Sequence, residues 1–370
     1  MVRPRHGDSA LMIAKYPQPV CYCIPKDSTT FKNKTRPVIF LQHGFLGSSF
    51  EWVANSPSQS AAFVFADAGF DVWMGNFRGN TYSRRHIRYN PDKDMIYWDW
   101  SWDQISQYDI PAMIAKVRNE TRQDSVYYIG HSLGTLSMFS KLSKDIHFSK
   151  YIKRFFALAP IGTVQHVRGT FTFFAKHLGV LYQKHVRRIG GDELFGSAMW
   201  FKNLIKNTCG MLNIFGKVCS DITLSFVGME HNNWNRTRLP VYLSHCPAGS
   251  SSNILSHFIQ MHINGGISSF DMGNQTNIDV YNQDRPPVYN FSRIDNIPIY
   301  LFWSHDDWLS TYQDIKQSII DVIKPGIIQK SIEIPKYNHL DFIWGTNAPF
   351  YVYNPIIELI ISNDYIIDAD

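Results

Sequence analysis

Three widely separated stretches of the chain carry side chains that could act together in nucleophilic catalysis. The first reads G-H-S-L-G, and its centre is Ser132. It follows a short apolar run and precedes a stretch of helical character. At such a corner, G-x-S-x-G holds the serine in a strained backbone conformation with its hydroxyl exposed at the carboxyl edge of a sheet. Since short glycine–serine patterns also arise by chance, the pentapeptide alone fits a plain turn equally well.

A serine nucleophile needs a base that takes its proton and a carboxylate that holds the base in the correct tautomer. The second stretch, S-H-D-D-W, offers Asp306 and Asp307, and the third, K-Y-N-H-L-D-F, offers His339. Taken separately, either aspartate fits the N-cap of a following helix, and His339 fits a hydrogen-bonded loop residue. Taken together, the order serine, aspartate, histidine favours a catalytic triad with Ser132 as nucleophile and His339 as base.

The negative charge that develops on an attacked carbonyl oxygen needs backbone N–H donors. One donor is expected from Leu133, the residue after the nucleophile. The other usually comes from the loop after an earlier strand, and here the apolar run V-I-F-L-Q leads into H-G-F-L-G, which offers the N–H of Phe45. His-Gly after a strand also fits a tight turn, but the serine motif downstream favours an oxyanion hole.

A parallel sheet is expected to bring these residues together. Short apolar segments typical of buried strands alternate with helix-length stretches at 56–69 and 108–123, which favours a parallel sheet covered on both faces. The carboxyl ends of such strands meet at one edge, so distant sequence positions can converge there. The strand-like segments are 37–42, 70–75, 126–130 and 155–160, followed after a long gap by 297–303 and 327–335.

The long gap in the strand pattern predicts an insertion. From about residue 162 to 287 the sequence is a succession of aromatic and amphipathic pieces without strand rhythm. Because this segment leaves and rejoins the sheet at its carboxyl edge, we expect it to lie over the site as a cap. The predicted organisation is an N-terminal segment 1–35, a first core part 36–161, the cap 162–287 and a second core part 288–370.

Composition and charge limit the class of protein and of partner. Hydrophobic residues at 44% and charged residues at 18% are typical of a globular chain. The net charge of +5 comes from scattered Lys and Arg residues, so nucleic acid is not an expected partner. No apolar run reaches the roughly 18 residues that a membrane-spanning helix needs. Serine ester chemistry needs no metal and no organic cofactor, and we expect none.

The cysteines and the N-x-S/T sequons bear on the cellular compartment. The five cysteines lack the spacing of a zinc site. Cys209 and Cys219 either close a small loop or are buried free thiols. The N-terminus makes a poor signal peptide, yet five sequons suggest a secretory route. We interpret the chain as starting inside a longer precursor, or as having an altered first exon, and expect a secreted or lysosomal protein. The sequons are at Asn33, Asn119, Asn235, Asn274 and Asn290.

From about Arg36 to the C-terminus, the sequence resembles the acid lipase family of α/β-hydrolases, which contains gastric and lysosomal acid lipases. The resemblance implies an α/β-hydrolase fold with a cap and a mobile lid over about 162–287. It also implies a disulfide between Cys209 and Cys219. The stretches that carry it include LQHGFLGSSFEWV, GNFRGNTYSRRH, YYIGHSLGT, VYLSHCPAGSSSNILSHFIQ, FDMGN and YNHLDFIWGTNAPFYVYN.

The family's site residues match positions of this chain one by one. The resemblance implies Ser132 as the catalytic serine and His339 as the catalytic histidine, and through the D-W-L match it selects Asp307 as the catalytic aspartate. The oxyanion donors match Phe45 and Leu133. The chain departs from the family before Arg36, where the first edge of the sheet is expected to be weakened or rebuilt. It also departs at Ser304 and His305, where the family usually has glycine.

The resemblance implies hydrolysis of neutral lipid esters, triacylglycerols or cholesteryl esters, by a monomer acting at a lipid–water interface. The alternatives are a carboxylesterase of smaller soluble esters and, because the N-terminal edge departs from the family, a non-catalytic lipid-binding relative. Aromatic side chains of the cap suit an acyl-chain pocket, although each alone is more often a core residue. They are Phe171, Phe173, Phe174, Trp200, Phe201 and Phe226.

Overall fold

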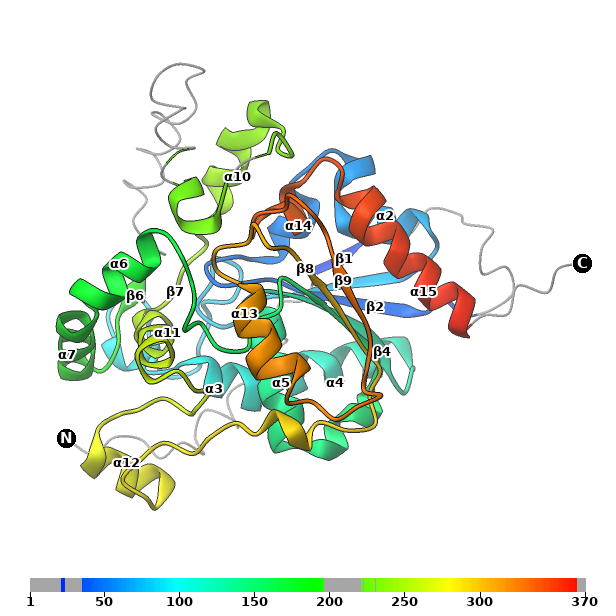
Figure 1. The fold of residues 1–370 in the computed structure, drawn as a ribbon. Coiled ribbons are helices and arrows are strands. Elements are labelled where there is room, and N and C mark those ends of the chain that lie inside the picture. Colours follow the sequence, from blue (N-terminus) through cyan, green and yellow to red (C-terminus); the bar gives the residue numbers. More distant parts are fainter. Residues whose placement is uncertain (1–20, 24–34, 196–220, 222, 230, 365–370) are drawn as a thin grey trace, which may run out of the picture.

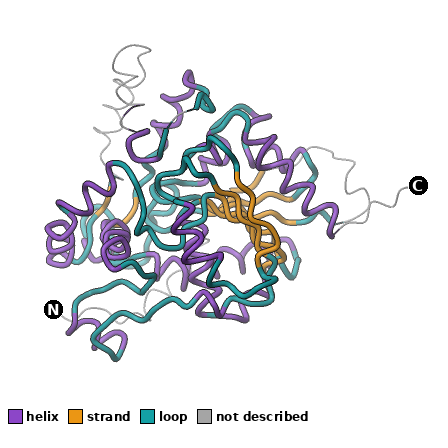
Figure 2. The backbone as a smooth tube through the Cα atoms, in the orientation of Figure 1, coloured by secondary structure: helices purple, strands orange, loops and turns teal. Residues whose placement is uncertain are grey.

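A seven-stranded sheet forms the centre of the protein in a computed structural model that describes residues 21–23, 35–195, 221, 223–229 and 231–364 (Figures 1 and 2). The strand order is β1-β3-β2-β4-β5-β8-β9, and every neighbouring pair is parallel except β1 with β3. The strands are β1 (Cys21–Cys23), β2 (Val38–Gln42), β3 (Asp71–Gly75), β4 (Val126–His131), β5 (Ile152–Leu158), β8 (Ile299–Trp303) and β9 (Ile328–Glu333).

The apolar runs of the sequence become strands because both faces of the sheet are covered. In β2, Val38 and Phe40 point into one hydrophobic cluster while Ile39 and Leu41 point into the other. The first cluster is closed by α4 (Ile110–Thr121), α5 (Leu133–Lys144) and α13 (Tyr312–Ile315). The second is closed by α2 (Ala61–Asp67), α14 (Asp341–Trp344) and α15 (Asn354–Asp364), on the opposite side of the sheet in Figure 1. This is the doubly covered parallel sheet predicted from the sequence.

All six predicted strands are present, with ends displaced by at most three residues. The largest displacement is in β5, which begins at Ile152 and not at 155. Its first residues include Lys153 and Arg154, and two charged residues in succession do not fit the apolar pattern of a buried strand. Arg154 is nevertheless buried, and its guanidinium donates to the Tyr300 hydroxyl of the neighbouring β8 at 2.7 Å. A buried charge with a hydrogen-bond partner on the next strand is therefore part of this sheet.

The edge of the sheet next to β3 is formed by a strand that the sequence analysis did not predict. Cys21–Cys23 pair antiparallel with β3, with Tyr22 opposite Trp73. A short strand from the region before Arg36 therefore covers this edge, where the sequence led us to expect a weakened or rebuilt border. A three-residue edge strand leaves few unpaired backbone groups for unwanted strand addition.

The chain between β5 and β8 supplies helices and a small two-stranded sheet that lie beside the central sheet, toward the left of Figure 1. Hydrogen bonds tie this segment to the core. The Ala248 N–H donates to the Leu46 carbonyl at 2.7 Å, and the Thr81 N–H donates to the Ala248 carbonyl at 2.8 Å. Its elements are α6 (Thr170–His177), α7 (Gly179–Ile189), β6 (Glu193–Leu194), α10 (Leu239–His245), β7 (Ser250–Ser251), α11 (Ser252–Asn264) and α12 (Asn274–Tyr281).

Helix α3 (Trp102–Gln104) continues through a π-helical turn, Ile105–Asp109, into α4.

Within the described ranges, we find no helix with both the length and the apolar character needed to cross a membrane.

Candidate active site

Ser132 occupies the sharp corner between β4 and α5. Its φ of 52° and ψ of −118° are strained for a residue with a side chain. The flanking glycines are needed because the corner is crowded. A Cβ on Gly130 would lie 2.9 Å from the Gly134 carbonyl carbon, and a Cβ on Gly134 would lie 2.6 Å from the Gln42 carbonyl oxygen. The G-x-S-x-G spacing therefore marks a strand-to-helix corner here, and a plain turn is excluded.

Asp307 and His339 meet in the buried interior beside this corner. His339 Nδ1 lies 2.8 Å from Asp307 Oδ2 and 3.1 Å from Oδ1. Asp307 Oδ1 also accepts the N–H groups of Leu309 at 2.9 Å and Ser310 at 2.8 Å. Because a carboxylate only accepts hydrogen bonds, the arrangement puts a proton on Nδ1 and leaves Nε2 of the ring as the free base.

The second aspartate is kept apart from this pair. Asp306 is about one-third exposed, and its carboxylate lies 3.3 Å from the ring of His231. It does not cap the next helix, because the side chain of Thr311 caps α13 by accepting the N–H of Asp314 at 3.3 Å. The helix-cap interpretation of Asp306 is therefore wrong, and the two adjacent carboxylates point to different surroundings.

His131, the residue before Ser132, connects the Ser132 corner to the loop that carries His339. His131 Nε2 donates to the His339 carbonyl at 2.9 Å, and the two rings lie 5.0 Å apart between centroids. Ser132 is 7% exposed and His339 4% exposed, so both side chains are almost completely buried. The hydrogen bonds of the described residues do not include one between Ser132 Oγ and the His339 ring.

The predicted oxyanion loop lies against the serine. A Cβ on Gly44 would be 3.0 Å from the Ser132 Cβ. Leu133 is the first residue of α5, so its N–H has no acceptor inside the helix. In the described part of the chain, the Phe45 N–H donates to no protein group either. Two backbone donors therefore remain available beside Ser132.

The buried ring of His43 stabilises this loop through hydrogen bonds. Its Nε2 accepts the Phe77 N–H at 3.0 Å, so its Nδ1 carries the hydrogen and donates to the Gly44 carbonyl at 2.8 Å. Complete burial lowers the pKa of His43, which keeps the ring neutral and preserves this tautomer. The histidine of the H-G-F-L-G loop is thus a structural support, a role that the sequence did not reveal.

Backbone contacts from the segment between β5 and β8 also reach the site. The Val227 carbonyl accepts the His339 N–H at 3.1 Å and the Trp308 N–H at 3.4 Å, so one peptide group joins the two loops that carry His339 and Asp307. Ser304, at a position where the resemblance led us to expect glycine, joins the same two loops. Its Oγ accepts the N–H groups of Asp306 and Tyr337, each at 3.2 Å.

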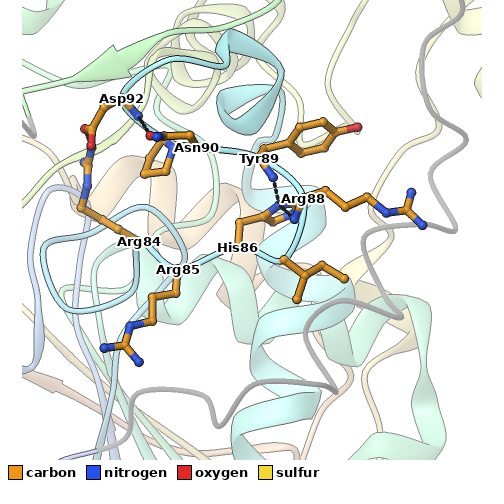
Figure 3. A pocket seen from close by; sticks show the side chains of 9 residues that line it. Arg84, Arg85, His86, Arg88, Tyr89, Asn90 and Asp92 are labelled. Carbon is orange, nitrogen blue, oxygen red and sulfur yellow. Dashed lines mark hydrogen bonds and ion pairs between the residues drawn. The ribbon is translucent and has the colours of Figure 1, made fainter.

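A surface pocket lined by residues 84–92 lies on a different loop, and none of the predicted catalytic residues lines it (Figure 3). Arg84 is its best-anchored side chain, with ion pairs to Glu193 and, at 2.7 Å, to Asp92. Its guanidinium also lies over the ring of Trp98. Since Glu193 belongs to β6, this ion pair connects the segment after β5 to the core.

Several other predicted residues differ in surroundings. Asn119, Asn274 and Asn290 are exposed, and Asn235 is partly exposed. Phe173 is 63% exposed and Phe226 40%, whereas Phe171 and Phe174 are partly buried.

Within the described ranges, no cluster of His, Cys, Asp and Glu could hold a metal ion. Cys209, Cys219, Trp200, Phe201 and Asn33 lie outside the described residues.

Comparisons of the sequence and of the structure match the chain to the alpha/beta hydrolase fold and to proteins named as lipases. Residues 37–346 match the family model for the alpha/beta hydrolase fold. The chain is 45% identical over 342 residues to lipase lipl-5 of Caenorhabditis elegans, covering 92% of this chain and 84% of that protein. It is 38% identical over 326 residues to human gastric triacylglycerol lipase, with coverages of 88% and 80%. A putative lipase from Sulfolobus solfataricus shares the fold, with a TM-score of 0.61, 13% identity and 93% coverage of both chains.

Proposed function

Since the chain belongs to the acid lipase family of α/β-hydrolases and is a serine ester hydrolase, we propose that it hydrolyses neutral lipid esters, triacylglycerols or cholesteryl esters. The proposed catalytic residues are Ser132, His339 and Asp307. The observation that carries this proposal is the buried contact of 2.8 Å between Asp307 and His339, beside a serine on a strained strand-to-helix corner. The relatives are named as lipases, one of them as a triacylglycerol lipase, which supports the substrate class.

In the proposed mechanism, Ser132 Oγ attacks the ester carbonyl carbon while His339 Nε2 takes the hydroxyl proton. Asp307 keeps the proton on Nδ1 and stabilises the imidazolium that forms. The N–H groups of Phe45 and Leu133 stabilise the oxyanion of the tetrahedral intermediate. The intermediate collapses, His339 gives its proton to the leaving alcohol, and an acyl ester remains on Ser132. Water activated by His339 then hydrolyses the acyl-enzyme and releases the fatty acid.

The same proposal includes a lipid–water interface as the partner and residues 162–287 as a cap. Helices α6 and α7 support it, because three apolar side chains there are strongly exposed: Phe173 at 63%, Val180 at 58% and Leu181 at 69%. Residues 162–190 carry five Lys or Arg residues and no Asp or Glu. Exposed apolar groups on a segment that also carries cationic residues are typical of segments that lie in a lipid interface.

The experiment is hydrolysis of emulsified triolein and cholesteryl oleate by the purified protein, compared with a soluble short-chain ester. We expect long-chain emulsified esters to be cleaved and Ser132→Ala to abolish turnover. A lipid-like phosphonate should add its mass to the peptide that contains Ser132. Cleavage of the soluble ester alone would make the protein a carboxylesterase of small substrates, and labelling of another residue would remove Ser132 as nucleophile.

We further propose a secreted or lysosomal location, supported by the exposure of the sequons at Asn119, Asn274 and Asn290. When the protein is expressed through a secretory pathway, glycosidase treatment should reduce its mass. A secreted product with no change in mass would contradict the glycosylation part of the proposal.

A further inference from the structure

A buried carboxylate that the proposed mechanism does not use lies next to the oxyanion loop, residues 43–47. Glu51 belongs to a short 3-10 helix, Ser49–Val53, and only 9% of its side chain is exposed. Its Oε1 accepts the Gly44 N–H at 3.1 Å. Its other oxygen fills the space where a Cβ on Gly47 would stand. The carboxylate therefore holds the loop by a hydrogen bond at Gly44 and packs against it at Gly47, on either side of Phe45, whose N–H is a proposed oxyanion donor.

A buried imidazole lies near the same oxygen of this carboxylate. His131 Nδ1 lies 3.7 Å from Glu51 Oε1, in ion-pair range but beyond hydrogen-bond distance, and within the described residues it has no hydrogen-bond partner. Its Nε2 donates to the His339 carbonyl at 2.9 Å. Only 3% of the His131 side chain is exposed. One ring thus connects the region of Glu51 with the loop that carries His339.

We propose that Glu51 and His131 are a pair of positioning residues that set the separation of the oxyanion loop, Ser132 and the His339 loop. The inference rests on the proposed function and adds two residues to its machinery. Contacts run from Gly44 through Glu51 and His131 to the His339 backbone, passing behind Ser132. A displacement of either loop by a fraction of an ångström would misalign the oxyanion donors or the base.

The surroundings favour this pairing. His43 also lies near Glu51 and His131, but burial lowers its pKa and its two ring nitrogens are already engaged with Gly44 and Phe77. The buried Tyr353 lies on another side of Glu51, and desolvation raises its pKa, so it is neutral. Among these neighbours, the His131 ring has a nitrogen, Nδ1, that lies 3.7 Å from the carboxylate and has no hydrogen-bond partner within the described residues.

The chain permits a test by conservative rescue. In Glu51→Gln an amide oxygen in the place of Oε1 still accepts the Gly44 N–H and stays near His131 Nδ1, whereas Glu51→Ala leaves the Gly44 N–H without this acceptor. In His131→Gln a side-chain N–H can still reach the His339 carbonyl, whereas His131→Leu removes the donor. Glu120→Ala, an exposed residue of α4, is the matched control.

The measurement is kcat and KM for a soluble short-chain ester at a temperature well below each variant's melting temperature, with the rate of phosphonate labelling of Ser132. We expect Glu51→Ala and His131→Leu each to lower kcat on the order of tenfold or more with KM nearly unchanged. Both Gln variants and Glu120→Ala should stay within about threefold of wild type. The Glu51→Ala/His131→Leu double variant should lose about as much as either single variant, because the two residues act as one unit.

The outcomes separate the pair from the proposed function. Wild-type turnover together with full activity of Glu51→Ala and His131→Leu would overturn the pair and leave the hydrolase intact. Equal losses in Glu51→Ala and Glu51→Gln, and in His131→Leu and His131→Gln, with multiplicative effects in the double variant, would also overturn it, since that pattern indicates two independent packing defects. A wild type that neither turns over esters nor is labelled at Ser132 would remove the proposed function and the pair together.

Discussion

The two adjacent aspartates show how strongly surroundings decide the role of a side chain. Asp307 is buried and accepts two backbone N–H groups in addition to the His339 ring, whereas Asp306 faces solvent and His231. Asp307→Asn should therefore leave the fold intact but lower turnover by a factor on the order of 10⁴, because an amide cannot hold the working tautomer of the histidine. Asp306→Asn should cost less than about tenfold.

Turnover of a soluble ester by both variants checks this expectation, with circular dichroism as the control for folding. A crippled Asp306→Asn beside a nearly normal Asp307→Asn would mean that the orienting carboxylate had been assigned one residue too far along the chain.

The second glycine of the serine motif gives a stability prediction at the same scale. A Cβ on Gly134 would press against the Gln42 carbonyl, which is backbone of β2 and cannot rotate away. Gly134→Ala should therefore lower the free energy of unfolding by about 1–3 kcal/mol through overpacking. Gly266→Ala is the control, because a Cβ there meets nothing within 4 Å and the backbone φ is ordinary. Urea unfolding of the two variants decides it, and equal stabilities would contradict the steric argument.

The sequence predicted the residues whose own side-chain types point to chemistry. Ser132, His339 and the pair Asp306 and Asp307 were predicted because nucleophile, carboxylate and base follow strands in a characteristic order, and the family resemblance then selected Asp307 from the pair. Val227 could not be found in this way, since it acts through its carbonyl. Glu51 could not be found either, since nothing in S-S-F-E-W separates a buried glutamate from an exposed one on a short helix. Contacts made through the backbone or through burial become visible only in the folded chain.

Among the secondary-structure elements, buried strands were predictable because burial on both faces forces continuous apolar runs. The first residues of β5 were missed because a buried arginine with a tyrosine partner looks, in sequence, like a surface residue. Strand β1 was missed because three residues carry too little pattern to identify a strand. The helices between β5 and β8 were expected only as amphipathic pieces, since their order and packing depend on contacts with distant parts of the chain.

Helix α11 supplies a prediction about pH and stability. His257 stacks on Trp102 with ring centroids 3.3 Å apart, and its Nε2 donates to the Ser268 carbonyl at 2.8 Å. Burial lowers the pKa of His257 to about 4, from an ordinary value of 6.5, although the nearby Asp103 opposes the shift. Between these values the unfolded chain binds the proton more readily. The contribution of His257 to stability is therefore complete above pH 6.5 and is lost as the pH falls toward 4.

His257→Gln keeps a donor for the Ser268 carbonyl but does not titrate. The free energy of unfolding of the wild type minus that of His257→Gln should decrease by about 3 kcal/mol between pH 7 and pH 4. Chemical denaturation of both proteins at several pH values measures this difference. If it stays constant over that range, then His257 is not a neutral buried group.

At the scale of the whole molecule, the segment between β5 and β8 contacts the site loops at several places. Val227 holds the His339 loop, Ala248 holds the oxyanion loop through Leu46, and Glu193 pairs with Arg84 of the core. The same segment carries the exposed apolar and basic surface of α6 and α7. The proposed lipid-binding surface is thus built on a segment whose backbone also positions the proposed catalytic residues.

Replacement of that surface should separate activity at an interface from activity in solution. Phe173→Ser/Leu181→Ser removes two strongly exposed apolar side chains and leaves the buried Ala175 and Val186 of the same helices in place. We expect hydrolysis of emulsified triolein to fall about tenfold, because the lost apolar area weakens adsorption to lipid. Hydrolysis of a soluble short-chain ester should be unchanged, since neither side chain belongs to the proposed catalytic residues.

The matched control is Phe350→Ser/Val288→Ser, which removes an aromatic and an aliphatic side chain that are 70% and 73% exposed outside α6 and α7. Any general effect of lowering surface hydrophobicity should appear in both double variants. Adsorption to vesicles that contain anionic lipid should weaken in Phe173→Ser/Leu181→Ser alone and should also decrease with added salt, because residues 162–190 carry only cationic Lys and Arg charges. Equal losses on the emulsion in the two double variants would show that α6 and α7 have no special part in binding lipid.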